Sequence, residues 1–258
     1  AMLLEKIIKE EKPNHFLVAF DAGKTTFRHS KYSEYKGGRQ KTPPELSEQF
    51  PYIRQLLDAY HIKRYELDNY EADDIIGTLS RQADEEDFET IIITGDRDLT
   101  QLATDNVTIY YTKKGVTDVD HYTPKFIAEK YNGLVPKQII DMKGLMGDTS
   151  DNIPGVAGVG EKTAIKLLNQ FESVEGVYEH IEEVTAKKLK EKLINSKDDA
   201  LMSKDLATIN VHSPIEVSLE DTKLTLQDDT AEKIELFKKL EFKQLLADID
   251  TSSNNEEV

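Results

Sequence analysis

Hydrophobic positions follow two alternating patterns along the first half of the chain. Short runs of consecutive apolar residues predict buried strands at His15–Phe20, Thr90–Ile93 and Val107–Tyr111. Apolar residues spaced three and four positions apart predict helices at Met2–Glu11, Pro44–Tyr60 and Tyr70–Arg81. Strands and helices that alternate in this way favour an α/β fold, with a mainly parallel central sheet flanked by helices.

The rest of the chain has a different pattern. From about Asp120 the apolar spacing is helical, and it predicts helices at Pro124–Tyr131, Pro136–Met146, Lys162–Phe171, Thr185–Leu193 and Thr230–Leu246. The segment Lys24–Thr42 has little apolar periodicity and is expected to be a long loop or an exposed helix. We therefore expect an α/β domain over residues 1–120, a helical domain over 121–250 and an acidic linker over 251–258.

Composition excludes several classes of protein. The 258 residues include no cysteine, which excludes a disulfide scaffold, a Cys-ligated zinc site and a Cys nucleophile. The apolar runs are too short to cross a membrane, and the N-terminus lacks the pattern of a signal peptide. We expect a soluble, cytoplasmic protein that does not contact a membrane.

The net charge of −16 seems unfavourable for nucleic-acid binding, but the charge is unevenly distributed. The segment Lys197–Val258 has 15 acidic and 7 basic residues, whereas Lys24–Lys41 has six basic residues and one acid, Glu34. Within this basic strip Tyr32, Tyr35, Lys36 and Arg39 combine aromatic and cationic groups, a mixture suited to stacking bases and binding phosphates. A solvated Lys-rich loop is the plainer alternative.

Acidic residues form four clusters, which are Asp21, then Glu71, Asp73 and Asp74, then Asp96 and Asp98, then Asp148 and Asp151. Any one cluster alone is more often an ordinary helix start or turn. Two clusters follow predicted strands, however, and the carboxyl ends of parallel strands meet at one edge of a sheet. Carboxylates gathered there would protonate unless a cation neutralised them. Oxygen-only ligands favour Mg²⁺ or Mn²⁺, and two such ions can hold a phosphodiester between an activated water and a leaving oxygen.

A glycine-rich turn separates two of the predicted helices. It contains Gly155, Gly158 and Gly160, and Lys162 and Thr163 follow at the start of the next helix. The segment is not a phosphate-binding P-loop, because glutamate follows the last glycine where that motif requires lysine. It suits a helix–hairpin–helix, whose backbone amides and following helix N-terminus receive a DNA phosphate. A plain inter-helix turn is the alternative.

These motifs resemble the 5′–3′ exonuclease (flap endonuclease) domain of bacterial DNA polymerase I, over about Leu3–Leu246. The segments that carry the resemblance are Phe20–His29, Tyr35–Arg39, Tyr70–Asp74, Thr94–Leu99 and Leu145–Gly160. The resemblance implies a PIN/FEN-like α/β nuclease with a helical arch over residues 24–42 and a C-terminal helix–hairpin–helix domain. It implies cleavage of DNA at 5′ ends and flaps of nicked or branched duplex in primer removal and repair. It also implies a monomer associated with the bacterial nucleoid, and a polymerase domain in the full-length chain.

The resemblance assigns roles to individual residues. Two divalent ions would be held by the eight clustered carboxylates, of which Asp21, Glu71, Asp96 and Asp148 are expected to be catalytic. Tyr35, Lys36 and Arg39 match the base of the arch, and Lys36 and Arg39 are also expected to act in catalysis by facing the scissile phosphate. Lys143 and Lys162 match DNA-contacting lysines, and the carbonyl groups of hairpin 155–160 would hold K⁺.

The chain departs from the family at its beginning. The family opens with a strand carrying Asp-Gly-Asn, which does not precede the helix expected at Met2. Loss of that ligand is expected to weaken metal binding and slow hydrolysis, while DNA binding persists. Two alternatives remain: a branched-DNA-binding module with impaired catalysis, and a metal-dependent RNA nuclease, against which the hairpin argues.

Overall fold

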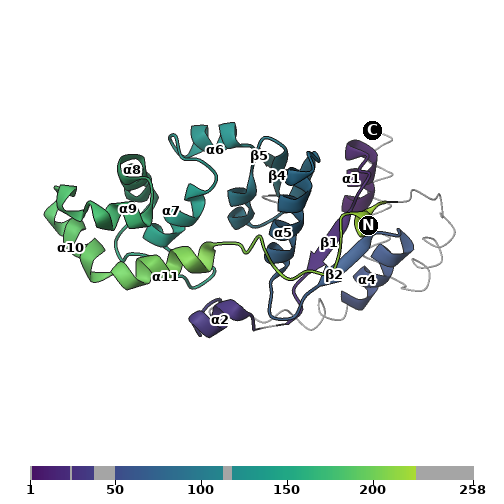
Figure 1. Ribbon diagram of the computed structural model, residues 1–258, viewed down its shortest axis with the longest axis horizontal. Coiled ribbons are helices and arrows are strands. Elements are labelled where there is room, and N and C mark those ends of the chain that lie inside the picture. Colours follow the sequence, from purple (N-terminus) through teal and green to yellow (C-terminus); the bar gives the residue numbers. More distant parts are fainter. Residues whose placement is uncertain (1, 24, 38–49, 113–117, 225–258) are drawn as a thin grey trace. The chain divides into compact units, whose positions relative to one another are not determined.

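The chain forms two compact units in the computed structural model (Figure 1). The structure describes residues 2–23, 25–37, 50–112 and 118–224. One unit takes its described residues from Ala1–Phe20, Lys41–Glu66 and Ile215–Val258. The other comprises Asp21–Gln40 and Leu67–Pro214.

The smaller unit packs helices on a two-stranded parallel sheet. Its elements are α1 (Met2–Glu11), β1 (Leu17–Phe20), α4 (Phe50–Ala59), β2 (Lys63–Glu66) and the short 3₁₀ helix η3 (Glu220–Thr222). Strand β1 pairs with β2 in the register Leu17↔Lys63 to Phe20↔Glu66. Leu56 and Leu57 of α4 are buried in the core of this unit, because with Ile53 and Tyr60 they follow the three- and four-residue spacing of one helix face.

The strands of the larger unit form a mixed sheet. Its elements are α2 (Phe27–Lys31), α5 (Ala72–Glu85), β3 (Thr90–Thr94), the 3₁₀ helix η1 (Arg97–Leu102), β4 (Val107–Thr112) and β5 (Val119–Tyr122). Strands β3 and β4 are parallel, and β5 runs antiparallel to β4. Ile92, Ile109 and Tyr122 are buried between this sheet and its helices. The chain after β3 leaves the sheet at Gly95 and enters η1, which has Asp96 as its N-cap and Asp98 in its first turn.

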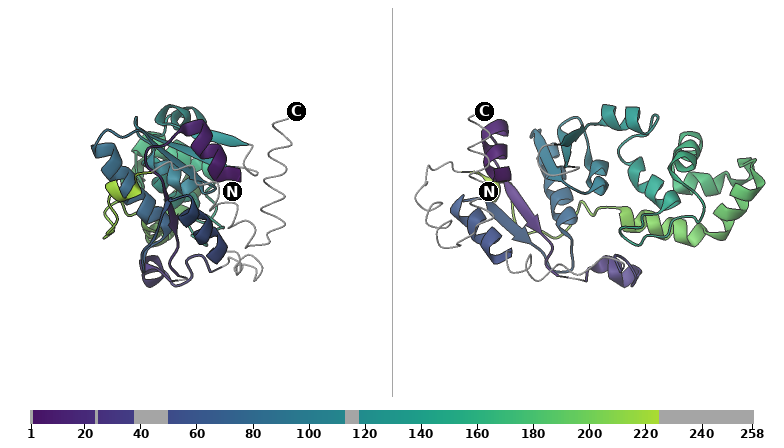
Figure 2. Two further views of the ribbon diagram at one scale, coloured as in Figure 1. Left: turned by 90° about the vertical axis from the view of Figure 1, so that its right-hand side faces the viewer. Right: turned by 180° about the vertical axis from the view of Figure 1, so that it is seen from behind.

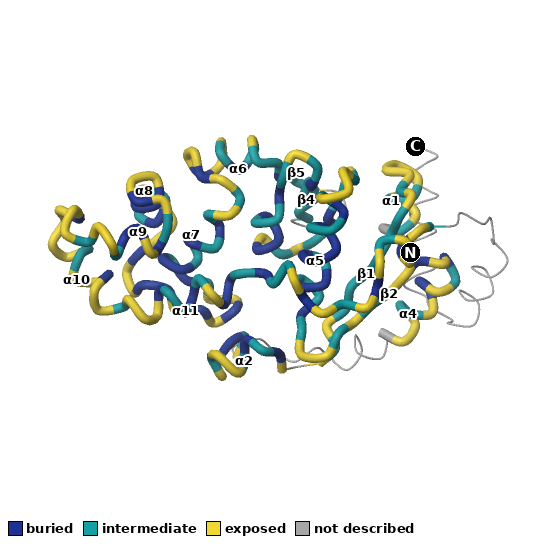
Figure 3. Tube along the Cα trace, viewed as in Figure 1, coloured by how far each residue is buried: buried dark blue, intermediate teal, exposed yellow. Residues whose placement is uncertain are grey.

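Helices make up the rest of the larger unit. They are α6 (Pro124–Lys130), α7 (Gln138–Met146), α8 (Glu161–Phe171), α9 (Val174–Glu179), η2 (Ile181–Glu183), α10 (Lys187–Asn195) and α11 (Lys197–Ala207). One apolar core continues from the sheet into them, including Ile109, Leu145, Leu168 and Leu193, so the sheet and these helices form one unit. Figure 3 shows the buried residues concentrated where α7, α8, α9 and α11 face one another.

The sequence predicted most of these elements. Strands β1, β3 and β4 and helices α1, α5, α6, α7, α8 and α10 lie where expected, with ends that differ by a few residues. Strands β2 and β5 escaped prediction because their sequences, Lys-Arg-Tyr-Glu and Val-Asp-His-Tyr, are largely polar. Helices α9 and α11 went unpredicted, whereas α2 lies in the segment expected to be a long loop or an exposed helix. Helix α4 lies within the helix expected at Pro44–Tyr60, and the helix expected at Thr230–Leu246 lies outside the described residues. No helix among the described residues is long and apolar enough to cross a membrane.

Helices α7 and α11 pack closely because α7 contains a glycine at their contact (Figures 1 and 2). A Cβ at Gly144 would lie 3.0 Å from Lys204 Cβ, 3.0 Å from Val174 Cγ2 and 3.1 Å from the Ala200 carbonyl oxygen. We expect Gly144→Ala to lower the free energy of unfolding by about 1–3 kcal/mol through overpacking, as measured by urea denaturation. The matched control is Gly23→Ala, because a Cβ at Gly23 meets nothing within 4 Å. Equal effects of the two changes would contradict this account of the helix contact.

Candidate active site

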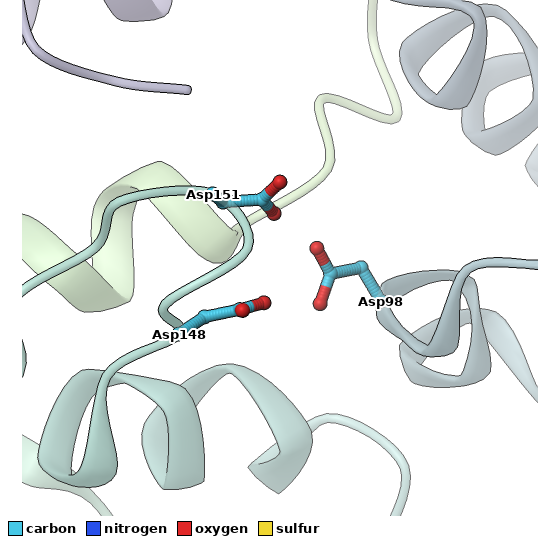
Figure 4. Close-up of side chains that lie close together, drawn as sticks. All are labelled: Asp98, Asp148 and Asp151. Carbon is cyan, nitrogen blue, oxygen red and sulfur yellow. The ribbon is translucent and has the colours of Figure 1, made fainter. Parts of the chain in front are cut away.

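Three carboxylates converge in the larger unit (Figure 4). Asp98, Asp148 and Asp151 each offer one oxygen, and these oxygens all lie within 4.8 Å of one another. Asp98 comes from η1, whereas the other two come from the turn that follows α7. That turn is closed by paired backbone hydrogen bonds between Asp148 and Ile153, of 2.9 and 2.8 Å. The local fold thus holds two of the acids rigidly and brings them to the third.

The donor chemistry of this group fits a divalent cation. Asp98 and Asp151 are buried, and among the residues that the structure describes the Lys143 ammonium is the partner of Asp98 Oδ1. Burial raises the pKa of Asp98 to about 7; Lys143 opposes this shift, and the charges of Asp96 and Asp151 add to it. Carboxylate oxygens without His or Cys are the ligands of hard ions such as Mg²⁺ and Mn²⁺.

Lys143 places an ammonium group inside this carboxylate group. Its Nζ forms an ion pair with Asp98 Oδ1 and donates a hydrogen bond of 2.6 Å to Asp148 Oδ2. Burial alone would raise the pKa of Asp148, but Lys143 and the donors of Ser150 hold it below its usual value. Lys143 is expected from the sequence to contact DNA, and here it contacts two predicted metal ligands.

A second acidic group lies at the start of α5. Glu71 is the N-cap residue, and its buried carboxylate receives the Tyr35 hydroxyl at 3.2 Å and ion pairs from Arg28 and Lys36. Asp73 lies in the first turn of the helix. Burial raises the pKa of Asp73 well above its usual value, and the neighbouring charges of Asp96, Glu71 and Asp98 add to the shift, with Lys36 opposing it. These interactions link the second acidic group to the η1 acids.

Asp74 has a different environment from the other predicted ligands. Its side chain is fully buried, and each oxygen accepts two hydrogen bonds. Arg28 donates to both oxygens at 2.8 Å, and the backbone amides of Asn210 and Glu71 donate at 2.9 and 3.1 Å. Because four donors already surround the carboxylate, the Asp74 side chain holds Arg28 and the start of α5 in place.

Arg28 connects three elements through one guanidinium group. Besides Glu71 and Asp74 on α5, it donates to the carbonyl oxygens of Leu206 at 3.0 Å and Thr208 at 2.7 Å, at the end of α11. Its own helix, α2, supplies the third element. Charge analysis of the sequence places Arg28 among the six basic residues of the strip Lys24–Lys41 and gives it no further role. The signal that could have singled it out is its place in the segment Thr-Phe-Arg-His.

The remaining predicted acids lie at element ends. Asp21 is exposed, and its Oδ1 accepts a hydrogen bond of 2.7 Å from the Ala72 amide at the start of α5. Asp96 is half-buried and caps η1 by accepting from the Asp98 amide at 2.9 Å. Both acids are thus tied to the helices that carry the other clusters.

Besides Arg28, the basic strip contributes Tyr35 and Lys36 to the site. Tyr35 is buried, and burial together with the Glu71 charge raises the pKa of its hydroxyl. Lys36 has a positive φ of 57° and donates its amide to the Asp151 carbonyl oxygen at 2.7 Å. The strip therefore touches both acidic groups. Arg39, the third residue predicted there, lies outside the described residues.

The glycine-rich segment forms a tight hairpin between α7 and α8. Gly155 and Gly158 have φ of 61° and 82°, and Gly160 is the N-cap of α8 without a side-chain cap. The backbone amide of Gly155 donates to Ser203 Oγ at 2.9 Å, which anchors the hairpin on α11. Lys162 is exposed and Thr163 half-buried in the first turn of α8. This arrangement leaves the helix start open to an anion.

Comparison with known proteins identifies the family. The family described as 5′–3′ exonuclease, N-terminal resolvase-like domain, matches residues 1–132, and 5′–3′ exonuclease, C-terminal SAM fold, matches residues 134–230. The chain belongs to the 5′–3′ exonuclease family. This membership confirms the resemblance drawn from the motifs and the expected α/β fold with a C-terminal helical domain.

Two curated relatives are DNA polymerases. The chain is 65% identical over 247 residues to DNA polymerase I of Bacillus subtilis and 58% identical over 257 residues to that of Bacillus caldotenax. These alignments cover 95% and 99% of this chain but 28% and 29% of the relatives. The exonuclease-family chain thus spans less than a third of the length of these relatives.

Two solved structures share the fold. Bacteriophage T5 5′-exonuclease with bound divalent metal ions (zinc) aligns with a TM-score of 0.68 at 24% identity, covering 81% of this chain and 79% of that one. The catalytic core of Rad2 in complex with DNA substrate aligns with a TM-score of 0.59 at 18% identity, covering 92% and 77%. At these identities the likeness shows the fold.

The Arg28 contacts generate a stability prediction. Arg28→Met would leave the carboxylates of Glu71 and Asp74 buried without their shared cation, so we expect the free energy of unfolding to fall by about 3–5 kcal/mol. The control is Lys31→Met, which breaks an exposed ion pair with Asp205 and should change stability by less than about 1 kcal/mol. Chemical denaturation measures both. Similar losses of stability in the two variants would contradict the role of Arg28 as the shared cation of Glu71 and Asp74.

The raised pKa of Asp98 generates a pH prediction for the metal-free chain. A carboxyl whose pKa is about 7 when folded and near 4 when unfolded binds its proton more tightly in the folded state. Its contribution to stability is therefore full below about pH 4 and is lost as the pH rises to 7, by at most about 1.4 kcal/mol per pH unit. We expect wild type to lose stability relative to Asp98→Asn between pH 4 and 7, in urea titrations with EDTA. A constant difference across that range would contradict the raised pKa.

Proposed function

We propose that this chain is a structure-specific 5′–3′ exonuclease and 5′-flap endonuclease that hydrolyses DNA phosphodiesters, with a role in primer removal and repair. The observation that carries this proposal is the group Asp98, Asp148 and Asp151, whose closely spaced carboxylate oxygens fit a divalent ion. The group lies in the same compact unit as the hairpin 155–160. Family membership supports the reaction class, and the T5 and Rad2 structures with metal ions or DNA support the ligands.

The proposed cofactors are two ions of Mg²⁺ or Mn²⁺. Asp96, Asp98, Asp148 and Asp151 would hold one, and Asp21, Glu71 and Asp73 would hold the other or its water shell. When bound, such ions supply Lewis acidity to the phosphodiester and lower the pKa of water. Asp74, predicted from the sequence as a further ligand, instead acts by positioning Glu71 through Arg28. The hairpin carbonyl groups are the proposed site for K⁺.

The protein's own side chains are proposed to contribute electrostatic stabilisation of the transition state. The Lys36 ammonium lies beside Glu71, and its charge is proposed to stabilise a phosphate that gains negative charge during the reaction. Arg39 is proposed to share this role. Tyr35 fixes the Glu71 carboxylate through its hydroxyl group. Because these groups are held before substrate arrives, they need little reorganisation in the transition state.

The proposed DNA contacts lie on the hairpin and on α8. The amides around Gly155, Gly158 and Gly160, with Lys162 and Thr163 in the first turn of α8, would receive a backbone phosphate. Lys143 would add a contact near the carboxylates. The proposed substrate is a 5′ flap or a nicked or branched duplex. We propose a polymerase domain in the full-length chain, which the likeness to DNA polymerase I supports. The full-length protein is proposed to be a monomer that associates with the nucleoid in the bacterial cytoplasm.

The test is cleavage of a 5′-labelled flap DNA under single-turnover conditions with Mg²⁺. We expect Asp148→Asn to lower the rate on the order of 100-fold or more, because it removes a ligand, with flap affinity in Ca²⁺ nearly unchanged. The control is Asp205→Asn, an exposed acid outside the site, which should leave the rate unchanged. Flap binding without cleavage by wild type would instead identify a branched-DNA-binding module, and preference for RNA in competition would identify an RNA nuclease.

Two lysine variants separate binding from chemistry. Lys162→Ala should weaken binding to duplex and flap DNA alike and reduce the salt dependence of binding, because it removes an exposed phosphate contact. Lys36→Ala should lower the single-turnover rate more than the affinity, because its charge is needed most in the transition state. Fluorescence anisotropy at several salt concentrations and quenched-flow cleavage measure the two effects. If both variants changed affinity and rate to the same extent, the proposed division would be wrong.

A further inference from the structure

The position of Lys143 goes beyond a DNA contact. Its side chain is 13% exposed, and its ammonium meets Asp98, on η1, and Asp148, in the turn after α7. These two acids come from segments separated by some fifty residues. The ammonium therefore joins the two sides of the carboxylate group within the larger unit.

An ammonium and a divalent ion compete for the same oxygens at this position. Three carboxylates whose oxygens lie within 4.8 Å repel one another and need nearby positive charge to stay ionised. Lys143 supplies one charge by contacting Asp98 Oδ1 and Asp148 Oδ2. A metal ion held by those oxygens would meet the ammonium at short range, and both cations cannot occupy one space.

We propose that Lys143 is the built-in counter-cation of the metal-free centre, and that a divalent ion binds by displacing its ammonium from Asp98 and Asp148. This inference rests on the proposed metal-dependent function. Lys143 is a positioning residue in the metal-free protein, because it holds η1 and the α7 turn together. Its ammonium becomes available to a DNA phosphate after displacement.

The residue type suits an exchangeable cation. Lysine carries a compact charge on a flexible four-carbon chain, so its ammonium can move away while its stem stays packed. Arg28, in contrast, uses its planar fork on four partners that include two backbone carbonyl groups, so no single ion could replace it. Of these two cations, Arg28 is fixed and Lys143 can leave.

The experiment measures Mn²⁺ binding to the metal-free chain by calorimetry, without DNA. Lys143→Met keeps an unbranched side chain of nearly the same size and removes its charge, and we expect it to bind Mn²⁺ roughly tenfold more tightly than wild type. The matched control is Lys166→Met, an exposed lysine on α8 whose side chain makes no ion pair with the carboxylates among the described residues. Its Mn²⁺ affinity should stay within about twofold of wild type, because exposed charges are screened.

Thermal unfolding separates the counter-cation from a packing role. In EDTA, Lys143→Met should melt below wild type, because Asp98 and Asp148 lose their shared cation. In saturating Mn²⁺ the difference should vanish, because the ion replaces the lost charge. A packing role for the lysine stem would lower the melting temperature equally in both conditions and would overturn the proposal. If the Met variant does not fold, Lys143→Gln is measured in the same way.

The outcomes distinguish this inference from the proposed function. Unchanged or weaker Mn²⁺ binding by the Lys143 variants, with normal binding by wild type, overturns the counter-cation role and leaves the nuclease proposal intact. Failure of wild type and all variants to bind Mn²⁺ overturns the proposed metal dependence, and the inference falls with it. Tighter binding confined to the Lys143 variants supports both.

Discussion

Repulsion among buried carboxylates is the constraint that the larger unit must satisfy. Two acidic groups, at the start of α5 and between η1 and the α7 turn, are partly neutralised by cations from elsewhere in the chain. Arg28 neutralises the first group from α2, and Lys143 neutralises the second from α7. Because each cation also joins separate elements, the charge balance and the tertiary structure of this region depend on the same contacts. The loss of either cation would therefore disturb both the charge balance and the packing of these elements.

The two cations solve this problem differently, and the difference matches what each group has to do. Asp74 never needs a free oxygen, so it can be saturated by the Arg28 fork and two backbone amides. Asp98 is buried as well, but the contact of its Oδ1 among the described residues is with a single side-chain group, the Lys143 ammonium. The first arrangement gives rigidity, and the second gives a place that another cation can take.

The sequence predicted which residues carry charge, but not how each charge is used. Periodicity located α5, α7 and α8, and glycine spacing located the hairpin, because both depend on local rules of helix and turn formation. The division between Asp74 as a structural acid and Asp98 as an open one depends on Arg28 and Lys143, which lie 46 and 45 residues away in the chain. Such pairing is a tertiary property with no local signal. The polar strands β2 and β5 escaped prediction for the same reason, since their pairing partners create them.

The hairpin and the acidic turn are parts of one compact piece of backbone. Gly155 of the hairpin packs directly on Gly147 at the end of α7, and a Cβ at Gly155 would lie 2.2 Å from the Gly147 nitrogen. Asp148 follows Gly147, and the Val156 amide donates to the Leu145 carbonyl oxygen at 2.8 Å. The spacing between the hairpin amides and the carboxylates is therefore fixed by glycine contacts and backbone hydrogen bonds. Under the proposed function, a phosphate held at the hairpin would place the DNA strand at a set distance from Asp148. The protein backbone between the hairpin and Asp148 would then set the position of cleavage.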